Sequence, residues 1–319
     1  MEFVRTSEER FEGLPDYPFA PNYVEVPFST FPSLRMHYVD EGPVDSPTIL
    51  MLHGEPTWSY LYRKMIPPFV EAGFRVVAPD HIGFGRSDKP TDKTAYSFQA
   101  HVETMRAFVE SLSLNDITLI AQDWGGPIGL GVLATDPDRF SRVVAANTML
   151  HTVEAELEGR TRWSNHASGA GDVCVDQGLL AWILHSQRAS EFEASPSIAG
   201  TTVRPIPTEV LAAYDAPFPD ESHKAGMRQF PALIPVTPDD PGAWINRNTW
   251  KVLSEFEKPF LTLFSDSDPS TAGWEEIFQE RIPGASGEPH GVIEEAGHFI
   301  QEDAGPELAV AILDWLESR

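Results

Sequence analysis

Residues 118–135, TLIAQDWGGPIGLGVLAT, decide the fold. They begin with a short apolar run typical of a strand buried on both faces, and from Gly125 they have the length and spacing of a helix. Between the two, Ala121 and Gly125 flank Asp123 in a small–x–nucleophile–x–small layout, which permits a strained turn that lifts the central side chain above a sheet. The segment therefore predicts a strand, a nucleophile elbow at Asp123 and a helix, with a helix N-cap as the alternative role of Asp123.

The same alternation of strands and helices extends over the first 150 residues. Short apolar runs predict strands at residues 48–52, 75–79, 116–121 and 142–146. Longer helical patterns lie between them, at residues 60–72, 98–113 and 125–135. Strands that alternate with helices predict right-handed crossovers and a parallel sheet, and residues 23–28 and 34–39 predict an antiparallel edge pair.

The strand pattern stops in the middle of the chain and then resumes. From His151 to Pro235, prolines and glycines punctuate short apolar stretches, which predicts a mostly helical insertion that starts with a long polar loop up to about Gln177. Strands are predicted again at 259–264 and 291–293, and helices at 274–281 and 306–316. We therefore expect a core of residues 1–150 and 236–319 that is interrupted by a helical cap of residues 151–235.

Composition narrows the class of protein. The 319 residues include 48 Asp and Glu against 23 Lys and Arg, and the net charge of −25 argues against nucleic acid and anionic membranes as partners. The lone Cys174 excludes a disulfide framework and a multi-thiolate metal site. Without an apolar leader or an uninterrupted apolar window, the chain is expected to be soluble and cytoplasmic. The acidity fits either salt adaptation or an ordinary acidic protein.

Two later segments carry the partners that a nucleophilic aspartate needs. Asp266 and Asp268 follow the strand predicted at 259–264, and His298 follows the last strand. In open α/β sheets the site lies outside the carboxyl ends of the strands, so a nucleophile, an acid and a histidine would converge there in that chain order. Either aspartate fits the acid role. No G-x-S-x-G motif occurs, which disfavours a serine esterase.

The segment HGEPTW, residues 53–58, directly follows the strand at 48–52. Gly54 permits a sharp turn, and Pro56 has no N–H, so the amide of Glu55 can point into a cavity. Paired with the amide of Trp124, which follows the nucleophile, it would form an oxyanion hole.

The segments HGEPTWSYLYRKM, DHIGFGRSDKP, QDWGG, YDAPFPD and AGHFIQED resemble the α/β-hydrolase superfamily, and specifically the haloalkane dehalogenases that use two tryptophans to bind halide. The resemblance covers nearly the whole chain and is weakest between residues 151 and 177. It implies a mostly parallel eight-stranded sheet with a helical cap. It also implies hydrolysis of carbon–halogen bonds without a cofactor or a metal.

The resemblance assigns roles to the catalytic candidates. Asp123 corresponds to the nucleophile, His298 to the base and Asp268 to the acid that orients the base, with Asp266 as the competitor. The amides of Glu55 and Trp124 match the oxyanion hole.

The resemblance also implies a halide site and a pocket. The indole of Trp124 matches the first halide donor and Trp182 the second, with Trp163 as the alternative, while Phe218 and Pro219 match residues of the family's pocket. The expected partners are a small neutral haloalkane and water, with halide as a product, and the expected assembly is a monomer or small homo-oligomer.

Two other functions fit the same fold. An epoxide hydrolase also uses an aspartate nucleophile, but its ring opening needs acidic O–H donors, usually two cap tyrosines, and the predicted cap offers only Tyr214. A tryptophan after the aspartate is shared by both families, whereas Glu55 after His-Gly favours the dehalogenase. The third function is non-catalytic binding, against which the intact set of Asp123, His298 and Asp268 argues.

Overall fold

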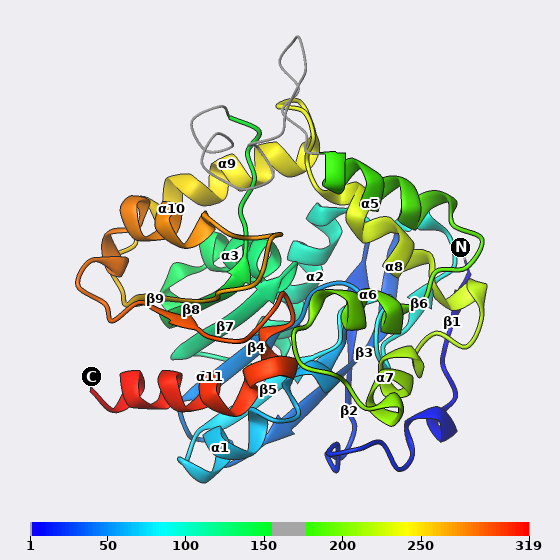
Figure 1. The fold of residues 1–319 in the computed structure, drawn as a ribbon, viewed down its shortest axis with the longest axis horizontal. Helices are drawn as coiled ribbons and strands as arrows, with labels where there is room; N and C mark the ends of the chain where they lie inside the picture. The colour runs from blue at the N-terminus through cyan, green and yellow to red at the C-terminus, as the bar shows by residue number, and fades with distance from the viewer. Residues whose placement is uncertain (1, 155–176, 319) are drawn as a thin grey trace.

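The computed structural model of the protein describes residues 2–154 and 177–318. Its centre is an eight-stranded sheet in the order β10-β9-β8-β7-β4-β5-β3-β2 (Figure 1). The strands are β2 (Asn22–Phe28), β3 (Phe31–Glu41), β4 (Thr48–Leu52), β5 (Arg75–Pro79), β7 (Ile117–Asp123), β8 (Phe140–Thr148), β9 (Phe260–Ser265) and β10 (Gly291–Ile293). β3 pairs antiparallel with β2 and β5, and all other pairs are parallel, which confirms the predicted sheet and its antiparallel edge.

The middle strands explain where the functional residues lie. β4, β5 and β7 are buried at every position, as expected for apolar strands with helices on both faces. β7 lies between β4 and β8, so Asp123 emerges at the centre of the carboxyl edge of the sheet.

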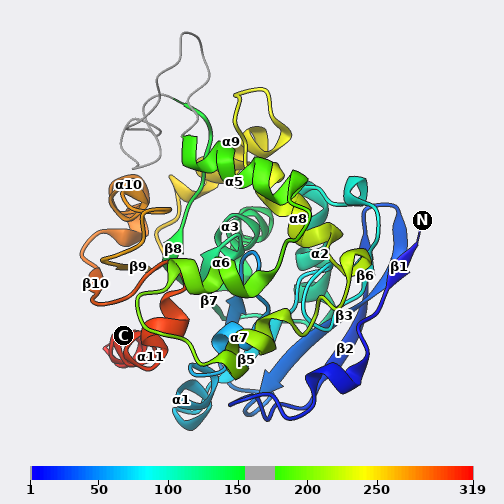
Figure 2. The same cartoon turned by 45° about the vertical axis from the view of Figure 1, so that its right-hand side comes forward.

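Helices cover both faces of the sheet. On one face α2 (Phe98–Ser111), α3 (Gly125–Thr135) and α9 (Pro241–Leu253) pack on one another, with α10 (Trp274–Arg281) beside β9. On the other face α1 (Ile66–Glu71) packs on α11 (Ile300–Glu317), as Figures 1 and 2 show. No helix in the described part of the chain is long and apolar enough to cross a lipid bilayer.

Helices also lie over the carboxyl end of the sheet. They are α5 (Gln177–Arg188), α6 (Ala194–Thr201), α7 (Thr208–Asp215) and α8 (Ala225–Gln229) (Figure 2). Within residues 151–235, the described positions form helices and turns and no strand. We propose that these helices are the cap, with the boundaries that the sequence predicts.

Several elements differ from the sequence prediction: α9 was not predicted, and two helices differ because of proline. The helix expected at 60–72 is a 3₁₀ turn, Ser59–Tyr62, followed by the short α1, because Pro67 and Pro68 fit only in the first turn of a helix. The helix expected at 306–316 is only the second part of α11, which already begins at Ile300. Pro306 follows a break at Ala304, where φ is −137° and ψ is 37°. The pair β1 (Phe3–Val4) and β6 (Lys89–Pro90) was not predicted, since two-residue strands carry no periodicity.

Candidate active site

Asp123 lies in a strained turn between β7 and α3. Its φ of +50° is in the left-handed region that non-glycine residues rarely adopt. A side chain at Gly125 would collide with the carbonyl of Leu52, and one at Gly126 with the hydroxyl of Thr148, so both positions must be small. Trp124 is the N-cap of α3, so Asp123 is not a helix cap but the raised residue of the turn.

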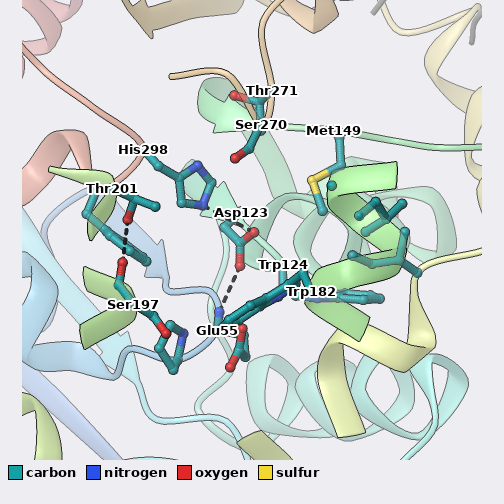
Figure 3. Close-up of a pocket in the computed structure, with 15 residues that line it drawn as sticks. Glu55, Asp123, Trp124, Met149, Trp182, Ser197, Thr201, Ser270, Thr271 and His298 are labelled. Atoms are coloured by element: carbon teal, nitrogen blue, oxygen red, sulfur yellow. Dashed lines mark hydrogen bonds and ion pairs between the residues drawn. The ribbon is translucent and has the colours of Figure 1, made fainter. Parts of the chain in front are cut away.

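Asp123, His298 and Asp268 form a contiguous set at the carboxyl edge of the sheet. Figure 3 shows the first two of them. His298 Nε2 lies 3.5 Å from Asp123 Oδ2, and His298 Nδ1 is 3.0 Å from Asp268 Oδ2. Asp266 instead accepts hydrogen bonds from the amides of Glu295 and Ala296. Of the two aspartates after β9, only Asp268 contacts the histidine.

The two carboxylates change the charge state of the histidine. Burial by itself lowers the pKa of His298, but the charges and hydrogen bonds of Asp268 and Asp123 outweigh burial and raise the pKa to about 10. Burial likewise opposes ionisation of Asp268, yet the charge of His298 and its hydrogen bonds lower the pKa of this carboxyl. At neutral pH the histidine is therefore an imidazolium between two carboxylates.

The loop after β4 brings one amide to the nucleophile. The N–H of Glu55 donates to Asp123 Oδ1 at 2.8 Å. A side chain at Gly54 would collide with the carboxylate of Asp123, so the glycine is needed here for close approach, and its predicted role as a turn residue is only part of the reason. The amide of Glu55 is thus a fixed donor at one oxygen of Asp123.

The side chain of Glu55 also faces the site. It is buried, and its Oε1 has no hydrogen-bond partner among the described residues. Burial, and then the charge of Asp123, raise the pKa of Glu55 well above its usual range. Burial and the neighbouring carboxylate therefore both favour the uncharged form of Glu55.

A cavity of about 320 Å³ opens in front of Asp123 (Figure 3). Trp124 from the core and Trp182 from α5 both line it. The rest of the wall is mostly apolar and includes Pro56, Met149, Leu179, Ile234 and Phe299. Trp124 is held by edge contacts with Phe98 and Phe230, at ring-centroid distances of 5.5 and 5.3 Å. Trp163, the other candidate for the second halide donor, lies outside the described residues.

Phe218 and Pro219, which the resemblance places in the pocket, are not in the wall of this cavity. The ring of Phe218 is buried with its edge against Phe84, at a centroid distance of 6.2 Å, and Pro219 is exposed. In the segment after α7 the ring of Phe218 points toward the core. This direction depends on packing partners that are distant in sequence.

Residues that sequence reasoning missed hold the histidine in place. Nδ2 of Asn147 lies 2.8 Å from the carbonyl oxygen of Gly297 and 3.0 Å from that of His298, and Nε2 of Gln122 donates to the same His298 carbonyl at 3.1 Å. On the acid side, Thr271 Oγ1 donates to Asp268 Oδ2 at 2.5 Å. Asn147 and Gln122 each directly follow a predicted strand. This position at the carboxyl end of a strand is the sequence feature that could have marked them as site residues.

Comparisons with known proteins agree with this geometry. A family model described as alpha/beta hydrolase fold matches residues 47–173. The chain is 49% identical to a haloalkane dehalogenase of Psychrobacter cryohalolentis, over 100% of this chain and 99% of that one. It is 48% identical to a haloalkane dehalogenase of Mycobacterium marinum, over 99% and 100% of the two chains.

A solved structure gives the same result. It is the tetrameric haloalkane dehalogenase DpaA from Paraglaciecola agarilytica, which superposes with a TM-score of 0.83 at 36% identity and covers 98% of this chain and 97% of that one. Because the similarity extends over the full length in both sequence and structure, the chain belongs to the haloalkane dehalogenase family, which has the α/β-hydrolase fold.

Proposed function

We propose that this chain hydrolyses the carbon–halogen bond of small neutral haloalkanes through an alkyl ester of Asp123, giving an alcohol, a halide ion and a proton. The observation that carries the proposal is that Asp123 and His298 line a mostly apolar cavity of about 320 Å³, which two indoles also line, while Asp268 binds the histidine. A cavity of this size and polarity suits a small apolar substrate.

In the first step, Asp123 displaces the halide. Its Oδ1 accepts the Glu55 N–H, so we assign the attack to Oδ2, the oxygen that lies 3.5 Å from His298 Nε2. Oδ2 forms a bond to the halogen-bearing carbon, and the electron pair of the carbon–halogen bond leaves with the halide. The product is a neutral ester, a covalent intermediate that divides one difficult reaction into two easier steps.

We assign the departing halide to the indole N–H groups of Trp124 and Trp182, which line the same cavity. Halide gains its charge in apolar surroundings, where a fixed N–H donor is worth more than in water. Two neutral donors stabilise the anion without a cation that would compete for Asp123.

In the second step, His298 acts as the base. Esterification removes the negative charge of Asp123, which is one of the groups that raise the pKa of His298, so the histidine becomes able to lose its proton and then to take one from water. The water attacks Cγ of Asp123, and the charge on Oδ1 is stabilised by the Glu55 N–H, joined in our proposal by the Trp124 N–H. Asp268 holds the imidazolium; as the intermediate collapses, His298 gives its proton to the departing alkoxide to form the alcohol, and then takes the proton of the Asp123 carboxyl to restore the carboxylate.

The tyrosines argue against epoxide opening. The hydroxyl of Tyr214 donates to Glu302 Oε2 at 2.7 Å and is buried away from the cavity. None of the chain's seven tyrosines, all of them at described positions, lines the cavity. The phenol donors that an epoxide oxygen needs are therefore missing from its described wall.

A panel of 1-bromoalkanes, 1-chloroalkanes and terminal epoxides tests the proposal. We expect the haloalkanes to release halide and acid in equal amounts, with little diol from the epoxides. Asp123→Ala should lose this activity. Opening of epoxides without halide release from any haloalkane would contradict the proposal.

We further propose that the protein is a monomer or a small homo-oligomer. Its relative DpaA is described as tetrameric. Light scattering of the purified chain should give a mass between one and a few chains, and a large assembly would contradict this.

A further inference from the structure

The carboxylate of Asp303 joins two parts of the molecule that meet above the site. Asp303 is 4% exposed and accepts three backbone N–H groups. Oδ2 binds Gly297 at 2.8 Å and Val203 at 2.9 Å, and Oδ1 binds Arg204 at 2.8 Å. Gly297 directly precedes His298, whereas Val203 and Arg204 follow α6 in the proposed cap. One side chain therefore binds both the histidine loop and the cap backbone.

A second contact makes the junction tight. The N–H of His298 donates to the carbonyl of Thr201 at 2.8 Å. Thr201 is the last residue of α6 and lines the cavity. A side chain at Gly297 would collide with the same Thr201 carbonyl. The backbone of the proposed base thus lies directly on the backbone of the cap.

The neighbouring acid provides a comparison within the same helical turn. Glu302 also binds the cap, through the hydroxyl of Tyr214, and it forms a buried ion pair with Arg63 and a partly buried one with Lys64. The side-chain contacts of Glu302 do not include the histidine loop. Glu302 and Asp303 therefore share burial and a cap contact, and differ in that Asp303 contacts Gly297 whereas Glu302 pairs with Arg63 and Lys64.

We propose that Asp303 is a positioning residue: by binding the cap backbone and the histidine loop together, it makes the position of His298 over the alkyl ester depend on the position of the cap. The inference rests on the proposed function, because it concerns the second step of that reaction. Alkylation of Asp123 needs the carboxylate and the halide donors, whereas hydrolysis of the ester needs His298 within reach of a water. Releasing the histidine loop should therefore slow hydrolysis and leave alkylation nearly unchanged.

The test compares Asp303→Asn with Glu302→Gln in rapid-quench reactions with excess 1-bromoalkane. An asparagine has one acceptor oxygen in place of two and no charge, and its NH₂ group faces backbone N–H donors, so the contact that the histidine loop and the cap share is weakened. We expect Asp303→Asn to release one equivalent of bromide per site near the wild-type rate, then to hydrolyse the ester on the order of tenfold to a hundredfold more slowly, as displacement of a catalytic group does. Peptide mass analysis should find alkylated Asp123 accumulating. Glu302→Gln should lose stability without accumulating the ester.

A second variant guards against misfolding of the first. Val203→Pro removes the cap N–H from Asp303, leaves the Gly297 contact in place, and changes a side chain that is 50% exposed. It should also slow ester hydrolysis relative to alkylation, by less than Asp303→Asn does. Unchanged ester hydrolysis in Val203→Pro, equal slowing of both steps in Asp303→Asn, or ester accumulation in Glu302→Gln would each overturn the coupling. Absence of bromide release by the wild type would instead refute the proposed function.

Discussion

At the scale of single residues, the candidate site residues lie where the strands of the sheet have their carboxyl ends. Asp123 and His298 were predictable because parallel strands bring their carboxyl ends to one edge. The choice between Asp266 and Asp268 was not decided by this pattern, since both follow β9; the backbone of Glu295 and Ala296 binds the first, which leaves the second for His298. Ring direction, as at Phe218, depends on packing partners far along the chain.

The halide donors give the first prediction. Trp182→Phe removes an indole N–H but keeps the aromatic packing. The free energy of bromide binding should therefore become less favourable by on the order of a few kcal/mol, as expected for a fixed donor in an apolar site. Titration with bromide, followed by quenching of tryptophan fluorescence, measures this. Trp244→Phe, at a position that is 62% exposed, is the matched control and should leave the bromide Kd unchanged. Undiminished bromide binding in Trp182→Phe would remove this residue from the halide site.

The side chain of Glu55 gives the second. Because burial and the charge of Asp123 raise the pKa of Glu55 and so favour its uncharged form, the neutral amide of Glu55→Gln should keep most of the wild-type kcat at pH 7. As the pH rises, the wild type gains a second negative charge beside Asp123 and the variant does not. The kcat of the variant should therefore decline at a higher pH than the kcat of the wild type. Loss of most activity in Glu55→Gln at pH 7 would show that the carboxyl acts as a charged group.

At the scale of elements, the sequence predicted the long core strands and α3 well, because apolar runs and a glycine-flanked turn are local signals. It failed where two elements meet. The first turn of α11 was missed because its contacts are entirely tertiary: Glu302 binds α7, and Asp303 binds the segment after α6 and the histidine loop. The contact of Thr201 with His298 likewise has no local signature.

That junction gives the third prediction. Gly297→Ala forces a methyl group against the Thr201 carbonyl and should lower the free energy of unfolding by about 1–3 kcal/mol, the usual cost of overpacking. Gly200→Ala, in α6, has open space around the new methyl group and should be stabilising by about 0.5–1 kcal/mol, because alanine favours a helix. Urea unfolding measures both, and equal effects of the two substitutions would refute close approach at Gly297.

At the scale of the whole molecule, one α/β core is assembled from both ends of the chain, and its charge of −25 bears on stability more than on the site. The proposed substrate and the proposed halide donors are uncharged. Self-repulsion of the acidic surface is screened by salt, so the free energy of unfolding should rise between low salt and about 1 M NaCl, where the Debye length falls to about 3 Å. Urea unfolding at both salt concentrations tests this, and a fall in stability would contradict it.

Stability should also depend on pH through His298. Its pKa is about 10 in the folded protein against about 6.5 for an unfolded histidine, so its contribution is complete below pH 6.5 and is lost as the pH rises toward 10. The expected loss is on the order of a few kcal/mol. It should be absent in His298→Gln, and parallel stability curves for wild type and variant would contradict the charged histidine.

A single turnover in ¹⁸O-labelled water, with enzyme in excess over a 1-bromoalkane, tests the covalent role of Asp123 most directly. Attack of water on Cγ of the ester puts the label into the carboxylate of Asp123, while the alcohol carries away the unlabelled Oδ2. Peptide mass analysis should therefore find ¹⁸O at Asp123, and the alcohol should contain only ¹⁶O. Labelled alcohol with an unlabelled Asp123 peptide would show that water attacks the substrate directly and would contradict the account.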